Sequence, residues 1–158
     1  MKKIALIALM GSCFVAQAEE NLKFSGTLIS PPNCSINNGN IIEVQFGDVL
    51  INKIDGKNYM KDVPYQITCD STVRDPSMTM TLTLTGKQAS FSGIALSTNI
   101  SALGIEIKLD EQPFTLNTAI TVNEQSKPVL KAVPVKQGGA ELKEGEFAAT
   151  ATLQVDYQ

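Results

Sequence analysis

Apolar and polar side chains alternate along most of the chain in short runs. A period of two predicts β-strands that bury one face and expose the other. The clearest run sets the apolar residues of 78–84 against the threonines between them, a pattern typical of half-buried antiparallel strands. Strands are expected at Asn21–Ile29, Ile41–Phe46, Val63–Cys69, Met78–Thr85, Gly104–Leu109, Phe114–Val122, Val129–Val135 and Phe147–Tyr157.

Turn-forming residues separate the expected strands, at positions 31–33, 37–39, 55–56, 75–76 and 138–139. Their Pro, Asn, Asp and Gly residues favour tight turns over continued strands. No long run has the spacing of an amphipathic helix, and neither a repeat nor a linker-like segment interrupts the chain. Short strands at this spacing predict an all-β chain that forms one sandwich-like domain.

The last expected strand carries the most regular apolar stripe. The residues on its apolar face are Phe147, Ala149, Ala151, Leu153, Val155 and Tyr157. All six point to one side of a strand, and the sequence offers no later segment to cover that edge. We interpret this strand as the wall of a groove. The alternative is an ordinary strand packed inside a closed sandwich.

A second stripe lies near the other end of the chain, with Leu22, Phe24, Gly26 and Leu28 on one face. We interpret it as a strand that can be donated to another chain. Gly26 interrupts the stripe, either as a weak point of an ordinary strand or as the residue that passes a narrow part of a groove. Together the two stripes favour a subunit that polymerises over an enzyme.

Residues 1–18 have the pattern of a secretory signal peptide. Lys2 and Lys3 precede an apolar run, and small residues at 16 and 18 mark a cleavage site. Removing 18 of the 158 residues leaves 140, which is enough for one domain. The alternative is cleavage before Cys13, which would attach a lipid to this cysteine and tether the chain to a membrane.

Removal of two lysines also changes the formal charge from −3 to −5. An acidic chain without a basic cluster argues against nucleic acid or an anionic membrane as the partner. No later stretch reaches the roughly 18 apolar residues of a membrane span, so the mature protein is not expected to be membrane-embedded.

Loss of the signal peptide leaves two cysteines, Cys34 and Cys69. In an exported protein this number predicts one disulfide. In the chain-entropy model a loop of this length stabilises the fold by roughly 3–4 kcal/mol. A structural zinc site needs more ligands, and the chain contains no histidine.

Candidate catalytic chemistry is sparse. The missing histidine excludes Ser–His and Cys–His nucleophile systems, and no nucleotide-binding or hydrolase motif occurs. Acidic residues at 110–111 and 141–146 are interpreted as surface charge. We therefore expect no catalytic residue, no metal site and no cofactor. A sugar site remains open, since Tyr59 lies in an expected loop, whereas Tyr65 and Tyr157 are expected in the core.

Several motifs follow one another in a characteristic order. The stripe of 22–28 precedes Pro31-Pro32-Asn33-Cys34 and Val44-Gln45-Phe46-Gly47-Asp48, and then come Pro64 to Cys69, Gly145 at the fourteenth place from the end, and a penultimate Tyr157. In this combination the chain resembles the minor pilins of chaperone–usher pili, above all the small tip and adaptor subunits. The similarity covers the whole mature chain.

The resemblance implies an incomplete immunoglobulin-like sandwich that lacks its seventh strand and is completed in trans. The periodicity alone gives enough strands for a complete sandwich. By this resemblance residues 19–30 form the donor-strand extension and residues 31–158 the pilin domain. Gly145 and the stripe that starts at Phe147 then form the acceptor groove. The implied partners are a periplasmic chaperone, an outer-membrane usher and neighbouring pilins or a tip adhesin, in a fimbrium outside the cell.

The leading hypothesis is therefore a structural tip or adaptor subunit of a pilus that supports adhesion. A two-domain adhesin of this family needs a second domain, for which the chain is too short. The alternatives are a major shaft subunit, a single-domain carbohydrate-binding adhesin and, remotely, a periplasmic enzyme.

Overall fold

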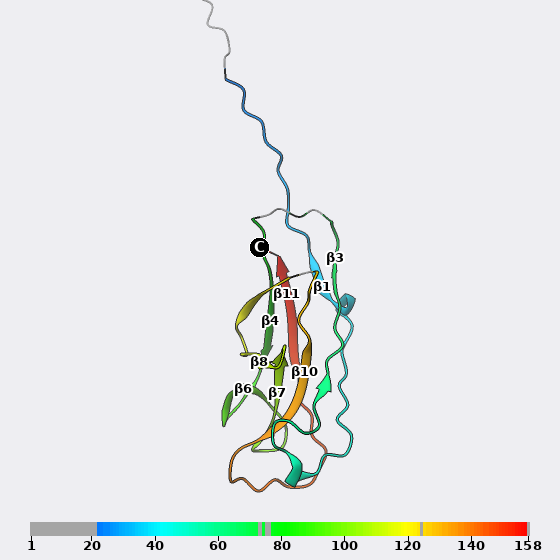
Figure 1. Cartoon of the computed structure of the whole chain (residues 1–158), viewed down its shortest axis with the longest axis vertical. Helices are drawn as coiled ribbons and strands as arrows, with labels where there is room; N and C mark the ends of the chain where they lie inside the picture. Colours follow the sequence, from blue (N-terminus) through cyan, green and yellow to red (C-terminus); the bar gives the residue numbers. More distant parts are fainter. Residues whose placement is uncertain (1–21, 73, 75–76, 124, 158) are drawn as a thin grey trace, which may run out of the picture.

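A computed structural model describes residues 22–157, except 73, 75–76 and 124 (Figure 1). The expected signal peptide and Cys13 lie outside these residues. The strands are β1 Cys34–Ile36, β2 Lys61–Asp62, β3 Ile67–Cys69, β4 Met80–Gly86, β5 Gln88–Ala89, β6 Ser92–Ser97, β7 Leu103–Leu109, β8 Gln112–Pro113, β9 Ala119–Val122, β10 Leu130–Lys136 and β11 Ala151–Tyr157. Two short 3-10 helices, η1 Asn37–Gly39 and η2 Ile51–Lys53, complete the described elements.

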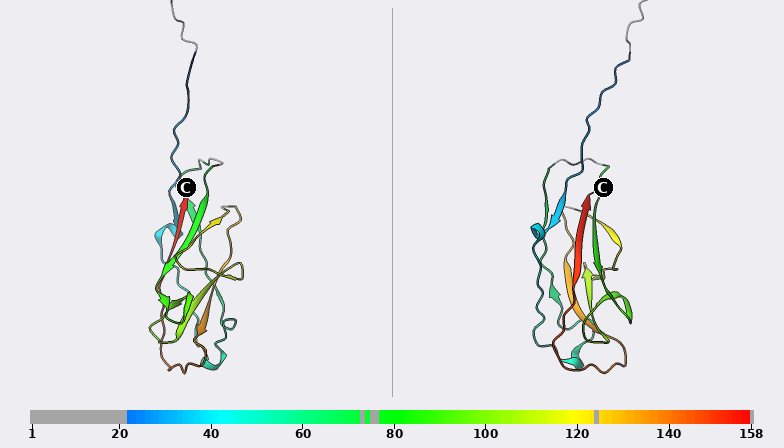
Figure 2. Two further views of the ribbon diagram at one scale, coloured as in Figure 1. Left: turned by 90° about the vertical axis from the view of Figure 1, so that its left-hand side faces the viewer. Right: turned by 180° about the vertical axis from the view of Figure 1, so that it is seen from behind.

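Every strand pair in the described chain is antiparallel. One sheet has the order β2-β10-β7-β6-β5, with β8 beside β7; a second has the order β11-β4-β9; and β1 pairs with β3. The two larger sheets form the layers of an elongated sandwich (Figure 2). The all-β prediction is confirmed. None of the helices in the described part of the chain has the length and hydrophobicity that crossing a membrane requires.

The hydrophobic core lies between the two larger sheets. Leu82 of β4 and Leu130 of β10 are fully buried members of this core, and Leu82 comes from a run with strict alternation. The two longest ladders align Leu84 with Leu153 and Ile107 with Ala132, so that the apolar faces of neighbouring strands coincide. The apolar stripes recognised in the sequence therefore become the inner faces of the sandwich.

Some expected strands are shorter than their patterns. Phe114 and Leu116 are buried, but the strand begins only at Ala119, because Asn117 adopts a left-handed conformation with φ 59° that a strand cannot contain. The hairpin β5–β6 at 88–97 was not expected, since Ala95 and Leu96 are buried side by side and break the alternation.

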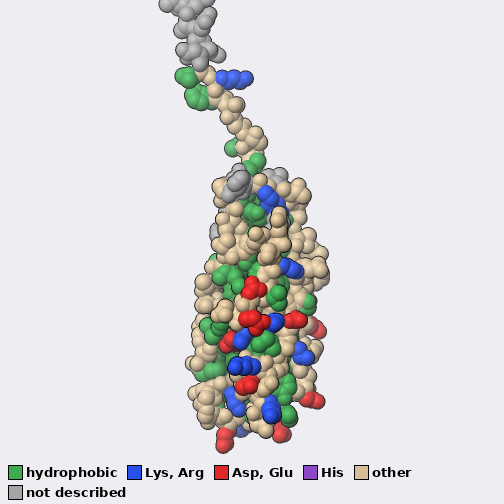
Figure 3. Space-filling view, in the orientation of Figure 1, with side chains coloured by type: hydrophobic (Ala, Val, Ile, Leu, Met, Phe, Trp, Pro, Cys, Tyr) green, Lys and Arg blue, Asp and Glu red, His purple; other side chains and the backbone are tan. Residues whose placement is uncertain are grey.

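Residues 22–31 extend away from the body as an arm (Figure 1). Leu22, Phe24 and Leu28 are 75%, 89% and 102% exposed, and within the described residues the arm pairs with no strand. Figure 3 shows hydrophobic side chains standing free on the arm, whereas charges of both signs interleave over the lower half of the body. A strand was expected at 21–29, and its described part is an unpaired segment because no partner lies beside it.

The arm leaves the body at a braced corner. The predicted Cys34–Cys69 disulfide is present and joins residues that are direct partners in the β1–β3 ladder. Next to it, the Asp70 carboxylate accepts hydrogen bonds from the backbone N–H and the side-chain amide of Asn33, both at 2.9 Å. The hydrogen bond from the Asn33 side chain, and then that from its backbone, lowers the pKa of Asp70. The arm therefore begins at a corner that a disulfide and a hydrogen-bonded carboxylate hold in place.

Candidate functional site

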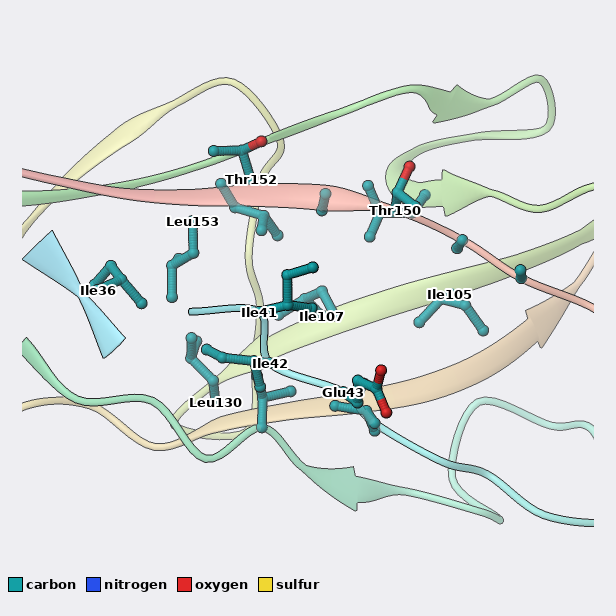
Figure 4. A pocket seen from close by; sticks show the side chains of 18 of the residues that line it. Ile36, Ile41, Ile42, Glu43, Ile105, Ile107, Leu130, Thr150, Thr152 and Leu153 are labelled. Carbon is teal, nitrogen blue, oxygen red and sulfur yellow. The ribbon is translucent and has the colours of Figure 1, made fainter. Parts of the chain in front are cut away.

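A groove of about 880 Å³ lies along one side of the sandwich (Figure 4). Residues 39–46 form one wall, and residues 147–153 form the other. The floor consists of core side chains seen through the opening between the walls, above all Ile105 and Ile107 of β7 with Leu130 and Ala132 of β10. The groove is therefore a place where the core of the sandwich reaches the surface.

The first wall has the alternation of a strand without the pairing of one. Ile42, Val44 and Phe46 are half-buried and pack against the core, whereas the residues between them are exposed. Within the described chain, residues 40–50 belong to no β-ladder. The backbone donors and acceptors of this wall can therefore pair with an incoming strand.

The second wall is an edge strand. β11 pairs with β4 on one side, and in the described structure its other edge, toward the groove, has no ladder partner. Ahead of β11, the side chain of Asn99 takes the place of a neighbouring strand. Its Oδ1 accepts the Ala148 N–H at 2.7 Å, and its Nδ2 donates to the Glu146 carbonyl at 3.0 Å. Asn99 thus holds the wall extended where no ladder reaches it.

The two walls run in opposite directions. At one end the rings of Phe46 and Phe147 meet across the groove, with centroids 5.8 Å apart. At the other end Ile36 lies near Leu153, as Figure 4 shows. Counting inward from the aromatic pair sets small Ala149 opposite the larger side chain of Val44. The walls therefore leave most room in the middle of the groove and least at the aromatic pair.

The chemistry of the groove suits an extended apolar segment and no reaction. Its lining is mostly aliphatic and aromatic, and Glu43 is its single charged residue. Among the residues described, no three His, Cys, Asp or Glu side chains gather as a metal site would require. What the groove offers is apolar surface between two segments whose edges toward the groove have no ladder partner in the described chain, which is the arrangement that binds a strand by β-augmentation.

The expected acceptor residues fall into two groups. Phe147, Ala149, Ala151 and Leu153 line the groove. The remaining three lie outside its lining: Gly145 is in the preceding loop, Val155 is buried in the core, and Tyr157 is half-buried beneath the Arg74 guanidinium. β11 twists from the groove into the core along its length, so a single-face pattern could not separate the two groups.

The expected donor residues are in the arm, far from the groove of the same molecule (Figure 1). The described chain therefore does not bring its own donor and acceptor residues together. The floor residues and Asn99 were missed as site residues. Strands were expected at 104–109 and 129–135, where the floor residues lie, but nothing local indicated that one face of these strands would be open.

The tyrosines, all of them described, offer little to a sugar. Tyr65 is buried, and its hydroxyl donates to the Pro128 carbonyl at 2.7 Å. Burial, followed by the charge of Asp110, raises the pKa of Tyr65 to about 12. Tyr59 is half-buried, and its hydroxyl accepts the Leu50 N–H at 3.1 Å. No tyrosine ring lies among the exposed residues, which weakens the case for a stacking platform.

Replacing Asn99 by Ala will loosen the wall at 146–148 and weaken strand binding. Two backbone groups lose partners, each worth about 0.5–1.5 kcal/mol. We expect a three- to tenfold drop in affinity for a donor peptide, about 1 kcal/mol in all. Fluorescence anisotropy of a labelled donor peptide measures the affinity. The matched control is Asn52→Ala, because Asn52 is exposed and lies outside the groove. Equal affinity for both variants would show that the Asn99 clamp is irrelevant to binding.

Comparisons with known proteins agree with this architecture. The family described as fimbrial protein matches residues 22–158. The chain is 48% identical over 162 residues to the fimbrial-like protein YfcQ of Escherichia coli K12, with all of both chains covered. It is 26% identical to the minor fimbrial protein PrsF of Escherichia coli, covering 96% of this chain and 95% of that protein.

A solved structure gives the same picture. The P pilus adaptor subunit PapF superimposes with a TM-score of 0.58 and 26% identity, covering 82% of this chain and 98% of that one. The open arrangement of the sheets in the present chain is therefore that of an immunoglobulin-like pilin.

Proposed function

From the chain's membership of the fimbrial protein family, we propose that this minor pilus subunit is assembled by donor-strand exchange. The chain is a structural, non-enzymatic pilus subunit, its partners are other pilins, and the family places it outside the cell. The observation that carries the proposal is the groove, whose two walls face each other over an apolar floor, with edges that have no ladder partner in the described chain.

The donor in this proposal is the arm of a neighbouring subunit. Its inward stripe of Leu22, Phe24 and Leu28 is exposed in the described chain. Burying each of these side chains contributes roughly 1.5–3 kcal/mol. Backbone hydrogen bonds to both walls add register and length. Side chains that are exposed to water in the isolated chain thus form the contact between neighbouring subunits of the fibre.

A groove of this kind needs protection before assembly. Apolar surface beside unpaired strand edges promotes aggregation. We infer that a periplasmic chaperone covers the groove after export, and that the outer-membrane usher is where the arm of the next subunit replaces it. This order requires the signal peptide expected at residues 1–18.

The groove and the arm together limit the positions that the subunit can take in the fibre. It has both a groove to receive a strand and an arm to donate one, so it can be extended in both directions, as a tip or adaptor component requires. A role as the major shaft subunit meets the same requirement, and the abundance of the chain in purified pili separates the two. Glycan-array binding by the completed subunit tests the adhesin alternative.

Gly26→Leu in the arm will block incorporation of this subunit into pili, while capture by the chaperone stays unchanged. The added side chain faces the interior of the neighbour's groove, where overpacking costs about 1–3 kcal/mol or more. Immunoblots of purified pili and of the periplasmic chaperone complex measure the two steps. Ser25→Leu is the matched control, because residue 25 faces the opposite side of the arm. Equal incorporation of the two variants would refute the inward assignment of Gly26.

The proposal as a whole is tested by displacement of the chaperone. The chaperone-bound subunit is mixed with peptides copied from the arms of fimbrial subunits, and free chaperone is measured by native gel electrophoresis. We expect at least one peptide to release the chaperone and to occupy the groove. Failure of every peptide would contradict donor-strand exchange for this chain.

A further inference from the structure

The groove and the arm carry complementary charges. Glu43, on the rim of the first wall, is the single charged residue of the groove lining. The described arm, residues 22–31, likewise has one charged residue, Lys23. Each is flanked by apolar residues that face the groove: Ile42 and Val44 in the wall, and Leu22 and Phe24 in the arm. When the arm is seated in the groove, the side chains of Lys23 and Glu43 therefore both face away from the core.

A second match concerns the narrow end. Phe46 and Phe147 meet across the groove with ring centroids 5.8 Å apart, which leaves little room for an inward side chain. The arm has one inward position without a side chain, Gly26. A strand in which Gly26 passes the aromatic pair therefore avoids a clash at this point.

Both matches occur in the same register. Lys23 and Glu43 differ by 20 positions, and so do Gly26 and Phe46. We propose that the groove accepts the arm of a second copy of this chain, with Lys23 beside Glu43 and Gly26 at the Phe46–Phe147 pair. The proposal rests on the proposed function and names the donor, so that identical subunits can follow one another in the fibre.

The shared offset also determines the direction of the donor. Equal offsets mean that the arm runs parallel to residues 41–46. Since the two walls are antiparallel, it runs antiparallel to β11, which is the more stable pairing. In the reverse direction, pairing Lys23 with Glu43 would bring Gly26 beside Asn40, at the far end from the aromatic pair. Only an arm that runs parallel to residues 41–46 pairs Lys23 with Glu43 and also places Gly26 at the aromatic pair.

The two large apolar side chains that precede Gly26 fit the same register. Leu22 comes to the level of Ile42, and Phe24 comes to the level of Val44. Opposite them the second wall presents Ala151 and Ala149, whose methyl groups leave room for a leucine and a phenylalanine. Beneath lie the aliphatic floor residues of β7 and β10. The largest donor side chain thus meets the widest part of the groove.

The test measures binding of a labelled peptide, copied from residues 20–31, to the dilute full mature chain by fluorescence anisotropy. Glu43→Lys in the chain will weaken binding by about tenfold, because an attraction becomes a repulsion. The peptide with Lys23→Glu will restore binding to Glu43→Lys within about twofold of the original pair. Glu141→Lys, an exposed change outside the groove, will leave binding unchanged.

The position of the glycine has its own compensation test. The peptide with Gly26→Leu will bind about tenfold or more weakly. Phe46→Ala in the chain removes one ring of the pair. On this variant, the Gly26→Leu peptide will bind closer in affinity to the unaltered peptide than it does on the original chain. No recovery on Phe46→Ala, or no recovery on charge exchange, would overturn the register.

The outcomes separate this inference from the proposed function. Binding of the peptide from this chain, with both compensations, supports a second copy as the donor. Binding of arm peptides from other fimbrial subunits, without binding of the peptide from this chain, overturns the second copy and leaves donor-strand exchange intact. Binding of no fimbrial arm peptide overturns both.

Discussion

Attaching a donor strand to the end of β11 will raise the melting temperature of the isolated chain by about 10 °C or more. The added segment copies residues 20–31 and follows a short flexible linker, so that it can turn back antiparallel to β11 and fill the groove. Its three large apolar side chains contribute roughly 1.5–3 kcal/mol each. Ordering the segment offsets part of this sum, which leaves a net gain of about 3 kcal/mol or more.

Calorimetry or circular dichroism measures the change. The control carries the same fusion with Leu22 and Phe24 of the added segment replaced by Ser, which keeps the backbone and the linker but removes most of the apolar contact. We expect this control to melt within a few degrees of the unmodified chain, about 1 kcal/mol at most. Equal melting temperatures for the fusion and its control would mean that the groove does not receive the arm side chains.

Replacing Cys34 and Cys69 together by Ser will destabilise the chain by roughly 3–4 kcal/mol and lower its yield sharply. The disulfide closes the loop between residues 34 and 69 and joins β1 to β3 at the corner where the arm leaves the body. The first wall of the groove lies within this loop. Loss of the disulfide therefore destabilises both the body and the first wall. Denaturant unfolding of the chaperone-free chain gives the free energy directly.

The third cysteine supplies the control. Cys13→Ser lies in the expected signal peptide and should leave the stability of the mature chain unchanged. If the unaltered chain is held in the membrane fraction and Cys13→Ser removes a lipid label from it, a lipid at Cys13 replaces the signal-peptide interpretation. A double Cys34→Ser, Cys69→Ser variant as stable as the original chain would contradict a structural role for the disulfide.

Alternation in the sequence predicted most of the scaffold. The pattern at 78–84 became the inner face of β4, and the patterns at 104–109 and 129–135 became β7 and β10. A period of two identifies an extended segment with one apolar face. It succeeds wherever that face is covered by the opposite sheet, because burial and alternation then report the same property.

Alternation could not predict which strands would lack a partner. Residues 41–46 alternate as regularly as β4, and their inward side chains are half-buried, yet no ladder includes them in the described structure. The sequence pattern reports which face is apolar, whereas pairing depends on the edge of the strand. The missing strand was therefore expected from the resemblance to pilins and not from periodicity.

Three local features were not predicted, for other reasons. Asn99 holds the second wall through contacts about 50 positions away along the chain, and its sequence neighbourhood contains only an ordinary turn. The hairpin at 88–97 was missed because buried neighbours break its alternation. Val155 belongs to the same stripe as Leu153 and yet lies in the core, since strand twist moves it out of the groove.

A structure of the full mature chain with a donor peptide copied from residues 20–31 tests the central claim most directly. We expect the peptide between residues 41–46 and β11, with backbone hydrogen bonds to both walls and Gly26 over the Phe46–Phe147 pair. Walls that pair directly with each other, or a groove filled by the arm of the same molecule, would contradict a sandwich that is completed by another chain.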